Sequence, residues 1–334
     1  NTFNYPYLKI QTTFRNIQYT NLYAELMDIN YFTTHGIDNQ DQMGYPKKYM
    51  SSHYLSINLA DNLNLSLFES VVWRMNHAPG SRGFDVNYLN PISLLRPIEY
   101  SLNSPDNVLL GFASKYTFTS SYIYGQLVVD EFSIDDLREK NGFWGNKIGY
   151  QIGYKVFDPF NIDRLTLQAE YNYVRPYTYA HHNPQQNYAH YNQPLAHPLG
   201  ANFSEFLVIL RYKINRFEFD SKIMLAKYGG KVINDPTSYG NDLYFSTGNF
   251  AEEEGLVNMG SGRPSDFDIY MYQGNLTFID YKKFNISYII NPVTNLKITL
   301  GFTDRNFSND DIILKTRFLN FGLTSDLFNN YYDI

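Results

Sequence analysis

The sequence has 334 residues, no cysteine and a formal net charge of -6, with 31 Tyr and 25 Phe but only 2 Trp. The acidic balance and the lack of a Lys/Arg-rich run exclude nucleic acid as an expected partner, and no apolar run reaches the ~18 residues of a membrane-spanning helix. A chain of this length forms either one large β-barrel or two soluble domains.

Alternating apolar and polar residues predict β-strands along the whole chain. In residues 147–157, for example, Ile148 and Tyr150 alternate with Gly149 and Gln151. Successive side chains of a strand point to opposite faces, so such a strand has one apolar and one polar face. The pattern predicts about 14 strands, at residues 4–20, 22–34, 47–60, 63–76, 107–119, 121–131, 145–157, 163–174, 203–214, 217–229, 267–280, 282–291, 295–306 and 312–326.

Tight turns and long loops join the predicted strands. Turn-forming residues place tight turns at Thr20-Asn21, Asp61-Asn62, Ser120, Asp158-Pro159-Phe160-Asn161, Asn215-Arg216, Tyr281 and Pro292-Val293-Thr294. The longer connections are residues 35–46, 77–106, 132–144, 175–202, 230–266 and the shorter 307–311. Structureless loops above about 15 residues are uncommon in compact soluble domains. Short turns on one rim and long loops on the other are typical of an outer-membrane barrel, with the turns in the periplasm and the loops outside the cell.

The predicted fold is an all-β, antiparallel, transmembrane up-and-down β-barrel that forms a single domain over residues 1–334, in the outer membrane of a Gram-negative bacterium. The alternative is a soluble β protein whose apolar faces pack on a second sheet. Two features break the strand pattern: Glu69 lies on an apolar face, and the charged Lys315 and Arg317 precede the apolar Leu319 in a way that predicts a β-bulge.

The polar faces would line the barrel lumen with charges of both signs. Such a lumen favours a plugged scaffold over a selective channel. The residues predicted to face the lumen are Lys147, Lys155, Glu170, Arg211, Lys213, Glu218, Asp220, Lys222, Lys297 and Arg305.

Loop 175–202 carries aromatic and amide side chains that suit sugar binding. Aromatic rings cover the C–H surface of a sugar, while amides and arginine bind hydroxyls or acidic groups. Tyr-rich loops also suit protein recognition. A third interpretation is that the rings pack on one another and seal the barrel mouth, because a long ordered loop needs a core of its own. The candidate ligand-binding residues are Arg175, Tyr177, Tyr179, Tyr188, Tyr191, Asn192, Gln193 and His197, with Arg96 and Glu99 from loop 77–106.

The sequence motifs of catalysis and of metal binding do not occur. The chain has neither a Gly-x-Ser-x-Gly nucleophile motif nor a phosphate-binding loop. His181, His182 and His190 match no zinc-site spacing, and Asp310 and Asp311 do not follow the calcium-loop pattern. The expectation is therefore a non-catalytic protein with no metal and no cofactor.

Two loop segments carry a resemblance to a known family. They read Arg96-Pro97-Ile98-Glu99-Tyr100 with Ser104-Pro105-Asp106-Asn107, and Gln193-Pro194-Leu195-Ala196-His197-Pro198-Leu199-Gly200-Ala201-Asn202. Both resemble the Wzi-like capsule-assembly family of outer-membrane barrels, and especially its RemB-like gliding-motility branch. The resemblance implies a barrel of about 18 strands with a helical plug on the periplasmic side. Because Asn1 begins almost inside a strand, the chain is interpreted as a mature or truncated form that lacks an N-terminal part.

The resemblance also implies a function. Its main implication is that aromatic-rich extracellular loops bind or anchor surface polysaccharide or lipopolysaccharide. For the gliding-motility branch it implies an accessory scaffold of the gliding or type IX secretion machinery, which docks a larger outer-membrane partner. A passive porin-like pore is the third interpretation. Outer-membrane lipid would surround the barrel in all three.

Overall fold

The computed structural model describes residues 4–29, 46–77, 80–81, 83–90, 106–131, 133–245, 247–248 and 262–325. These residues fold into one large antiparallel sheet of 13 strands, in which each strand pairs with the next one along the chain. The strands of this sheet are β1 (Tyr7–Phe14), β2 (Ile17–Met27), β3 (Lys47–Ala60), β4 (Leu63–Arg74), β7 (Asn107–Thr117), β8 (Ser121–Glu131), β9 (Lys147–Phe157), β10 (Leu165–Val174), β13 (Phe203–Ile214), β14 (Phe217–Gly230), β15 (Asn275–Asn291), β16 (Leu296–Ser308) and β17 (Ile313–Thr324).

Shorter elements lie in the connections between these strands. None of the helices in the described part of the chain is long and apolar enough to cross a membrane. The short elements are β5 (Asn76–His77), β6 (Gly80–Ser81), η2 (Val86–Leu89), α3 (Ile134–Glu139), η3 (Pro159–Asn161), η4 (Pro184–Gln186), β11 (Ala189–His190) and β12 (Gln193–Pro194).

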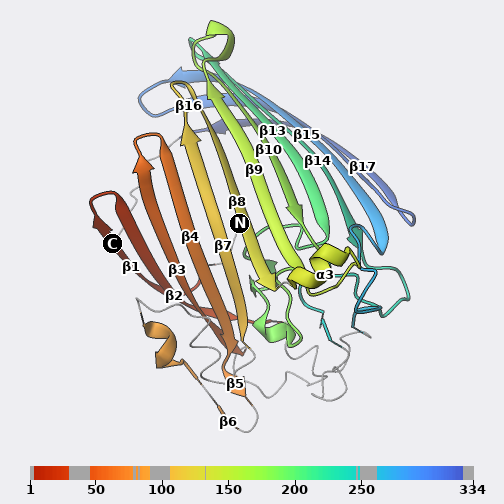
Figure 1. Cartoon of the computed structure of the whole chain (residues 1–334). Coiled ribbons are helices and arrows are strands. Elements are labelled where there is room, and N and C mark those ends of the chain that lie inside the picture. The colour runs from red at the N-terminus through yellow and green to blue at the C-terminus, as the bar shows by residue number, and fades with distance from the viewer. Residues whose placement is uncertain are drawn as a thin grey trace.

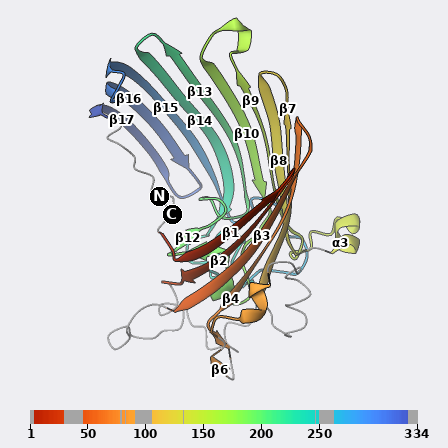
Figure 2. The same ribbon diagram turned by 90° about the vertical axis from the view of Figure 1, so that its left-hand side faces the viewer.

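The large sheet curves into a trough with two different rims. Figure 1 shows the tight turns gathered at one end of the strands and the longer connections at the other. Figure 2 shows β1–β4 and β13–β17 facing each other across the trough. The segment that contains β12 lies between these two sides. The predicted antiparallel, up-and-down arrangement is therefore correct for the sheet that the structure describes.

The structure corrects the predicted number of strands. Residues 275–291 form the single strand β15, which pairs continuously with β14 through Tyr281. The predicted tight turn at Tyr281 is therefore wrong. Residues 275–280 of one predicted strand and 282–291 of the next belong to the single strand β15, while residues 267–274 form no strand. With this correction, tight turns and connections at the loop rim alternate without exception along the 13 strands.

Two further local predictions are wrong. The first hairpin turns at Arg15-Asn16, five residues before the predicted Thr20-Asn21, because Phe14 pairs with Ile17. The β-bulge predicted in the last strand is absent from β17, whose register with β16 is continuous from one end to the other. The charge of Arg317 is accommodated by an ion pair with Asp304, at 3.1 Å.

The two faces of the sheet differ as the alternation predicts. Large apolar side chains such as Leu67, Phe112 and Ile152 are exposed on the convex face. The concave face carries ion pairs at the far side of the trough, where Glu218 lies 2.9 Å from Lys213 and 3.0 Å from Lys297. For these three residues, the prediction of a charged lumen is confirmed.

Glu69, which breaks the apolar pattern, has a partner on the convex face. Its carboxylate lies 3.0 Å from Nδ1 of His53, directly across from it on β3. The segment around η2 covers this part of the wall, because the hydroxyl of Ser51 donates to the carbonyl of Tyr88. Burying a polar group is tolerated where a partner satisfies it, so Glu69 is compatible with the strand.

Gly111 provides a first test of how closely the concave face is packed. The ring of Phe68 lies over Gly111, and a Cβ added there would come within 2.0 Å of it. We expect Gly111→Ala to lower the free energy of unfolding by about 1–3 kcal/mol, since overpacking forces side chains off their rotamers. Gly322→Ala on β17, whose Cβ meets nothing within 4 Å, is the matched control. Urea unfolding of both variants in detergent checks this, and equal losses of stability would contradict it.

Candidate functional site

A row of aromatic and small residues crosses the concave face below loop 175–202. Each member pairs directly with the next across the sheet. Aromatic rings stand at both ends of the row, and glycines in its middle leave a shallow floor between them. This aromatic row consists of Tyr54, Phe68, Gly111, Val128, Gly149, Val174 and Phe203.

A polar row lies two residues further along the same strands, toward the tight turns. Because side chains on one face of a strand repeat every two residues, it faces the same side as the aromatic row. Its hydrogen-bonding groups are mostly side-chain amides and end in a carboxylate. This amide row consists of Ser66, Ala113, Gln126, Gln151, Asn172 and Glu205.

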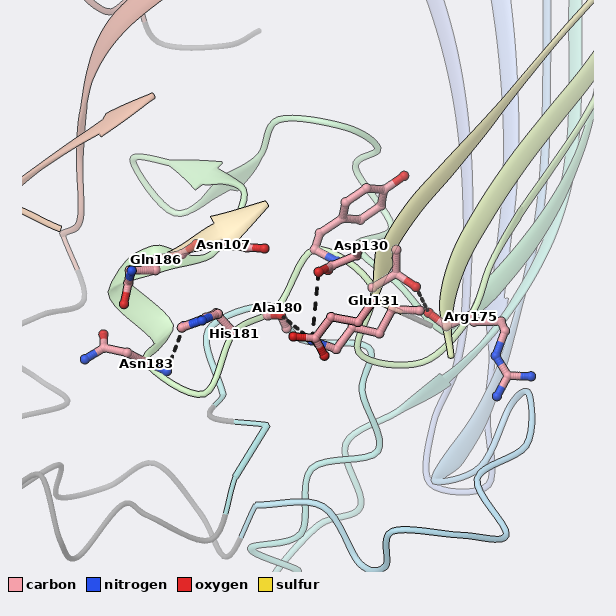
Figure 3. A network of polar contacts seen from close by, with 11 residues as sticks. Asn107, Asp130, Glu131, Arg175, Ala180, His181, Asn183 and Gln186 are labelled. Carbon is pink, nitrogen blue, oxygen red and sulfur yellow. Dashed lines mark hydrogen bonds and ion pairs between the residues drawn. The ribbon is translucent and has the colours of Figure 1, made fainter. Parts of the chain in front are cut away.

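Loop 175–202, termed the capping loop, folds over these two rows. Lys147 on β9 donates from Nζ to the carbonyl of Ala180, at 3.3 Å, and lies 3.1 Å from the carboxylate of Glu131. A register shift between Val129 and Glu131 places Asp130 at a bulge, and its carboxylate accepts the backbone N–H of Tyr179, at 2.8 Å. Bulges commonly re-aim a side chain in this way. Figure 3 shows Asp130 and Glu131 converging on this part of the loop.

A second set of contacts holds the middle of the capping loop against other strands. Lys48 on β3 is fully buried, and its Nζ donates to the carbonyl of Asn187, at 2.8 Å. The side-chain amide of Asn107 on β7 donates to the carbonyl of Gln186, at 3.0 Å. The loop is thus attached to β3, β7, β8 and β9, and it spans the trough rather than extending into solvent.

A cavity of about 230 Å³ remains between the capping loop and the sheet. It is lined from above by Tyr179, Tyr188 and His197 of the loop. We term it the inner cavity. From below it is lined by members of both rows, including Phe68, Gln126, Val128, Gly149, Gln151, Asn172, Val174 and Phe203.

The inner cavity adjoins a larger one of about 900 Å³ toward the tight-turn rim, termed the outer cavity. Gln126 and Gln151 line both cavities, so they mark the border between them. Two neighbouring rings lie on either side of this border, since Tyr54 lines the outer cavity and Phe68 lines the inner one. Their ring centroids are 6.1 Å apart and their planes are inclined by only 14°. Together they form an almost flat aromatic surface.

Hydrogen bonds fix the orientation of the amide row at its β10–β13 end. The amide of Asn172 donates to Glu205 and to Glu170, at 3.0 Å each. Glu205 also lies 3.3 Å from Nε2 of His197, whose ring stacks on Phe203 with centroids 4.4 Å apart. A fixed amide next to an aromatic floor is a preorganised arrangement for a polar ligand with an apolar face.

Three of the sequence-predicted site residues meet at the inner cavity: Tyr179, Tyr188 and His197. Burial raises the pKa of the Tyr179 and Tyr188 hydroxyls, so both are protonated at neutral pH and can donate a hydrogen bond. Gly149 leaves room for this arrangement, since a Cβ there would come within 3.2 Å of the Tyr179 hydroxyl oxygen.

Two other predicted residues are turned away from the cavity. Tyr177 is only 1% exposed, and its hydroxyl donates to the carbonyl of Ser238, at 2.6 Å. Figure 3 shows the guanidinium of Arg175 pointing away from Asp130, and it donates weakly to the carbonyl of Ile269, at 3.4 Å. For Tyr177, the interpretation that loop rings pack within the protein describes what the structure shows.

The remaining predicted residues lie along the loop's outer part or beyond the described residues. Tyr191 donates from its hydroxyl to the sulfur of Met27, at 3.0 Å, while Gln193 pairs with His190 between β11 and β12. Asn192 is exposed at the tip of this hairpin. Arg96 and Glu99 lie outside the described residues. Across those residues, no group of three or more His, Asp or Glu side chains could hold a metal ion.

The residues that sequence analysis missed belong to the sheet. Gln126, Gln151 and Asn172 all alternate with apolar neighbours, so each could be assigned to a polar face from the sequence. Their alignment in one row depends on the register between strands, which the sequence alone does not specify. The sequence therefore places each of these three residues on a polar face, but it does not show that they form one row.

No protein-family model matches the sequence, and a comparison with curated proteins gives no match. Among solved structures, the chain is similar to Wzi of Escherichia coli, described as a carbohydrate-binding β-barrel of the outer membrane involved in group 1 capsule assembly. The TM-score is 0.52 and the identity 11%, over 92% of this chain and 55% of that one. OprD of Pseudomonas aeruginosa matches with a TM-score of 0.40 and 10% identity, over 96% of this chain and 70% of that one. The chain therefore has a Wzi-like barrel fold, over little more than half of the length of Wzi.

Proposed function

We propose that this chain is part of a non-catalytic outer-membrane β-barrel that binds surface carbohydrate in the inner cavity, beneath the capping loop. The observation that carries the proposal is the pairing of the aromatic row with the amide row on one wall. Sugar rings combine an apolar C–H face with a rim of hydroxyls, so an aromatic floor beside side-chain amides matches both parts. The carbohydrate binding stated for Wzi supports the same class of ligand.

The convex face supports a location in the outer membrane. Exposed apolar side chains such as Leu110, Tyr154, Leu225 and Ile286 would contact lipid. In an up-and-down array of 13 strands the first and last strands run in the same direction. An all-antiparallel closed barrel therefore needs an odd number of strands in addition to these, and closure is required because lipid satisfies no backbone hydrogen bonds.

A double substitution in the amide row tests the proposed site. We expect Gln126→Leu with Gln151→Leu to weaken binding of a neutral oligosaccharide by about tenfold, since each lost hydrogen bond contributes roughly 0.5–1.5 kcal/mol. Gln11→Leu, on the concave side of β1 and outside both cavities, is the matched control. Calorimetric titration of the detergent-solubilised protein measures the effect. Unchanged affinity in a folded double variant would rule out this site.

The two other interpretations fit the described residues less well. A passive pore requires an open lumen, whereas the capping loop spans the trough between β3 and β9 through Lys48 and Lys147. The scaffold of a gliding or type IX secretion machinery, and membership of the RemB-like branch, stay predictions from the sequence. We favour carbohydrate binding because it alone explains the paired rows.

A further inference from the structure

We infer that the inner cavity is built for an uncharged sugar unit and discriminates against acidic sugars such as uronates. This inference rests on the proposed function and adds the chemical class of the ligand. It follows from three observations: the side chains that line the cavity, the carboxylates that lie next to it, and the position and partners of the lysines around it.

The lining of the inner cavity carries no lysine, arginine, aspartate or glutamate among the residues that the structure describes there. Its polar groups are the amides of Gln126, Gln151 and Asn172, the hydroxyls of Ser70, Tyr179 and Tyr188, and the ring of His197. Amides and hydroxyls both donate and accept, which suits sugar hydroxyls. They supply no full positive charge to balance a carboxylate.

Two carboxylates lie on the same face of the sheet as the amides, at the β10–β13 end of the amide row. Glu205 is 6% exposed and shares the amide of Asn172 with Glu170. The hydroxyl of Tyr124 donates to the second oxygen of Glu170, at 2.5 Å, which holds that carboxylate on the wall. The imidazole of His197 is already engaged by Glu205. A uronate placed here would meet two carboxylates and no free cation among these groups.

Three lysines lie around the capping loop and the amide row, and none of them lines the inner cavity. Lys147 is bound to Glu131 and to the carbonyl of Ala180. Lys48 is bound to Asn187. Lys222 faces the trough one strand beyond Glu205, at the level of Ile209, and does not line the cavity.

The outer cavity differs, since Arg15 and Lys115 line it. Acidic sugars can therefore find a cation in the trough, but not at the position where the loop closes over the aromatic row. Transferring a carboxylate from water into an enclosed site is unfavourable unless an opposite charge pairs with it. The discrimination is thus a property of the inner cavity, and the experiment must report on that cavity alone.

A competition experiment measures how the inner cavity discriminates between neutral and acidic sugars. A neutral oligosaccharide is bound first, and the concentration of competitor that displaces half of it is measured for matched pairs: oligomers of galactose and galacturonate, glucose and glucuronate, and mannose and mannuronate. We take the pair whose neutral member binds best. We expect its uronate to displace half of the bound ligand only at a concentration at least about tenfold higher than its neutral member needs. We also expect the neutral member's affinity to change little with salt, because no ion pair forms.

Gln151→Lys supplies the missing cation at the cavity wall, and we expect it to bring the uronate within about threefold of the neutral competitor. Gln11→Lys, outside both cavities, should leave the discrimination intact. A uronate that displaces the neutral ligand from the wild-type protein as readily as its neutral counterpart would overturn this inference while leaving carbohydrate binding in place. Failure of all six oligomers to bind would overturn the proposed function itself, and the inference with it.

Discussion

Lys147→Met is expected to release the capping loop. Lys147 is 1% exposed and joins the carbonyl of Ala180 to the carboxylates of Asp130 and Glu131. The substitution keeps the side chain's apolar length but removes the ammonium that lies 4.0 Å from the buried carboxylate of Asp130. Removing one partner of a buried ion pair typically costs about 3–5 kcal/mol, and the partial exposure of Glu131 argues for the lower end. About 3 kcal/mol would raise the open fraction of the loop more than a hundredfold.

Limited proteolysis and single-channel recording would detect this release. We expect new cleavage within residues 175–202, and a rise in conductance across a planar bilayer, because the loop no longer spans the trough. Lys155→Met on the same strand is the matched control, because its ammonium lies over the ring of Phe157 at the tight-turn end of β9. Equal protease resistance of both variants would show that Lys147 does not hold the loop.

The strands were predictable because their signal is local. Alternation with a period of two residues depends only on which side chains face lipid or lumen, and it located β9, β10, β13 and β14 to within two residues at each end. It failed at Tyr281, where Asp280 and Lys282 flank the tyrosine. These two side chains are neighbours on the convex side and form an ion pair at 2.7 Å. The two charges therefore lie within a continuous strand, although the sequence pattern predicts a turn there.

The site was less predictable because it depends on contacts between distant residues. Lys48 and Asn187 are 139 positions apart, and nothing in the sequence of the capping loop indicates that it folds inward onto Lys48. Two tyrosines of the capping loop show why the sequence alone does not identify the residues that line the cavity. Tyr177 and Tyr179 are two residues apart and chemically identical, yet one is enclosed next to Ser238 and the other lines the inner cavity.

Acid is expected to loosen the capping loop through His181. This side chain is 6% exposed, and its Nδ1 accepts the backbone N–H of Asn183, at 3.2 Å, as Figure 3 shows. Burial, followed by the neighbouring charges of His182, Lys147 and Arg74, holds the pKa of His181 well below 6.5. A protonated imidazole has no acceptor left for Asn183 and would place a positive charge in a buried site.

The sign of the pH effect follows from the two protonation states. A released loop takes up the proton near the ordinary pKa of about 6.5, whereas the packed loop does so only at lower pH. The packed loop is therefore fully stabilised above about pH 6.5, and that stability is lost as the pH falls toward the lowered pKa, by up to about tenfold in the open fraction per pH unit. Hydrogen exchange within residues 175–202, compared at about pH 7.5 and about pH 5, measures this loss. His181→Gln should flatten the pH dependence of exchange, whereas His182→Gln, the control, should retain it. A pH dependence that is unchanged in His181→Gln would assign the titration to another group. His190 is one such group, since burial also lowers its pKa.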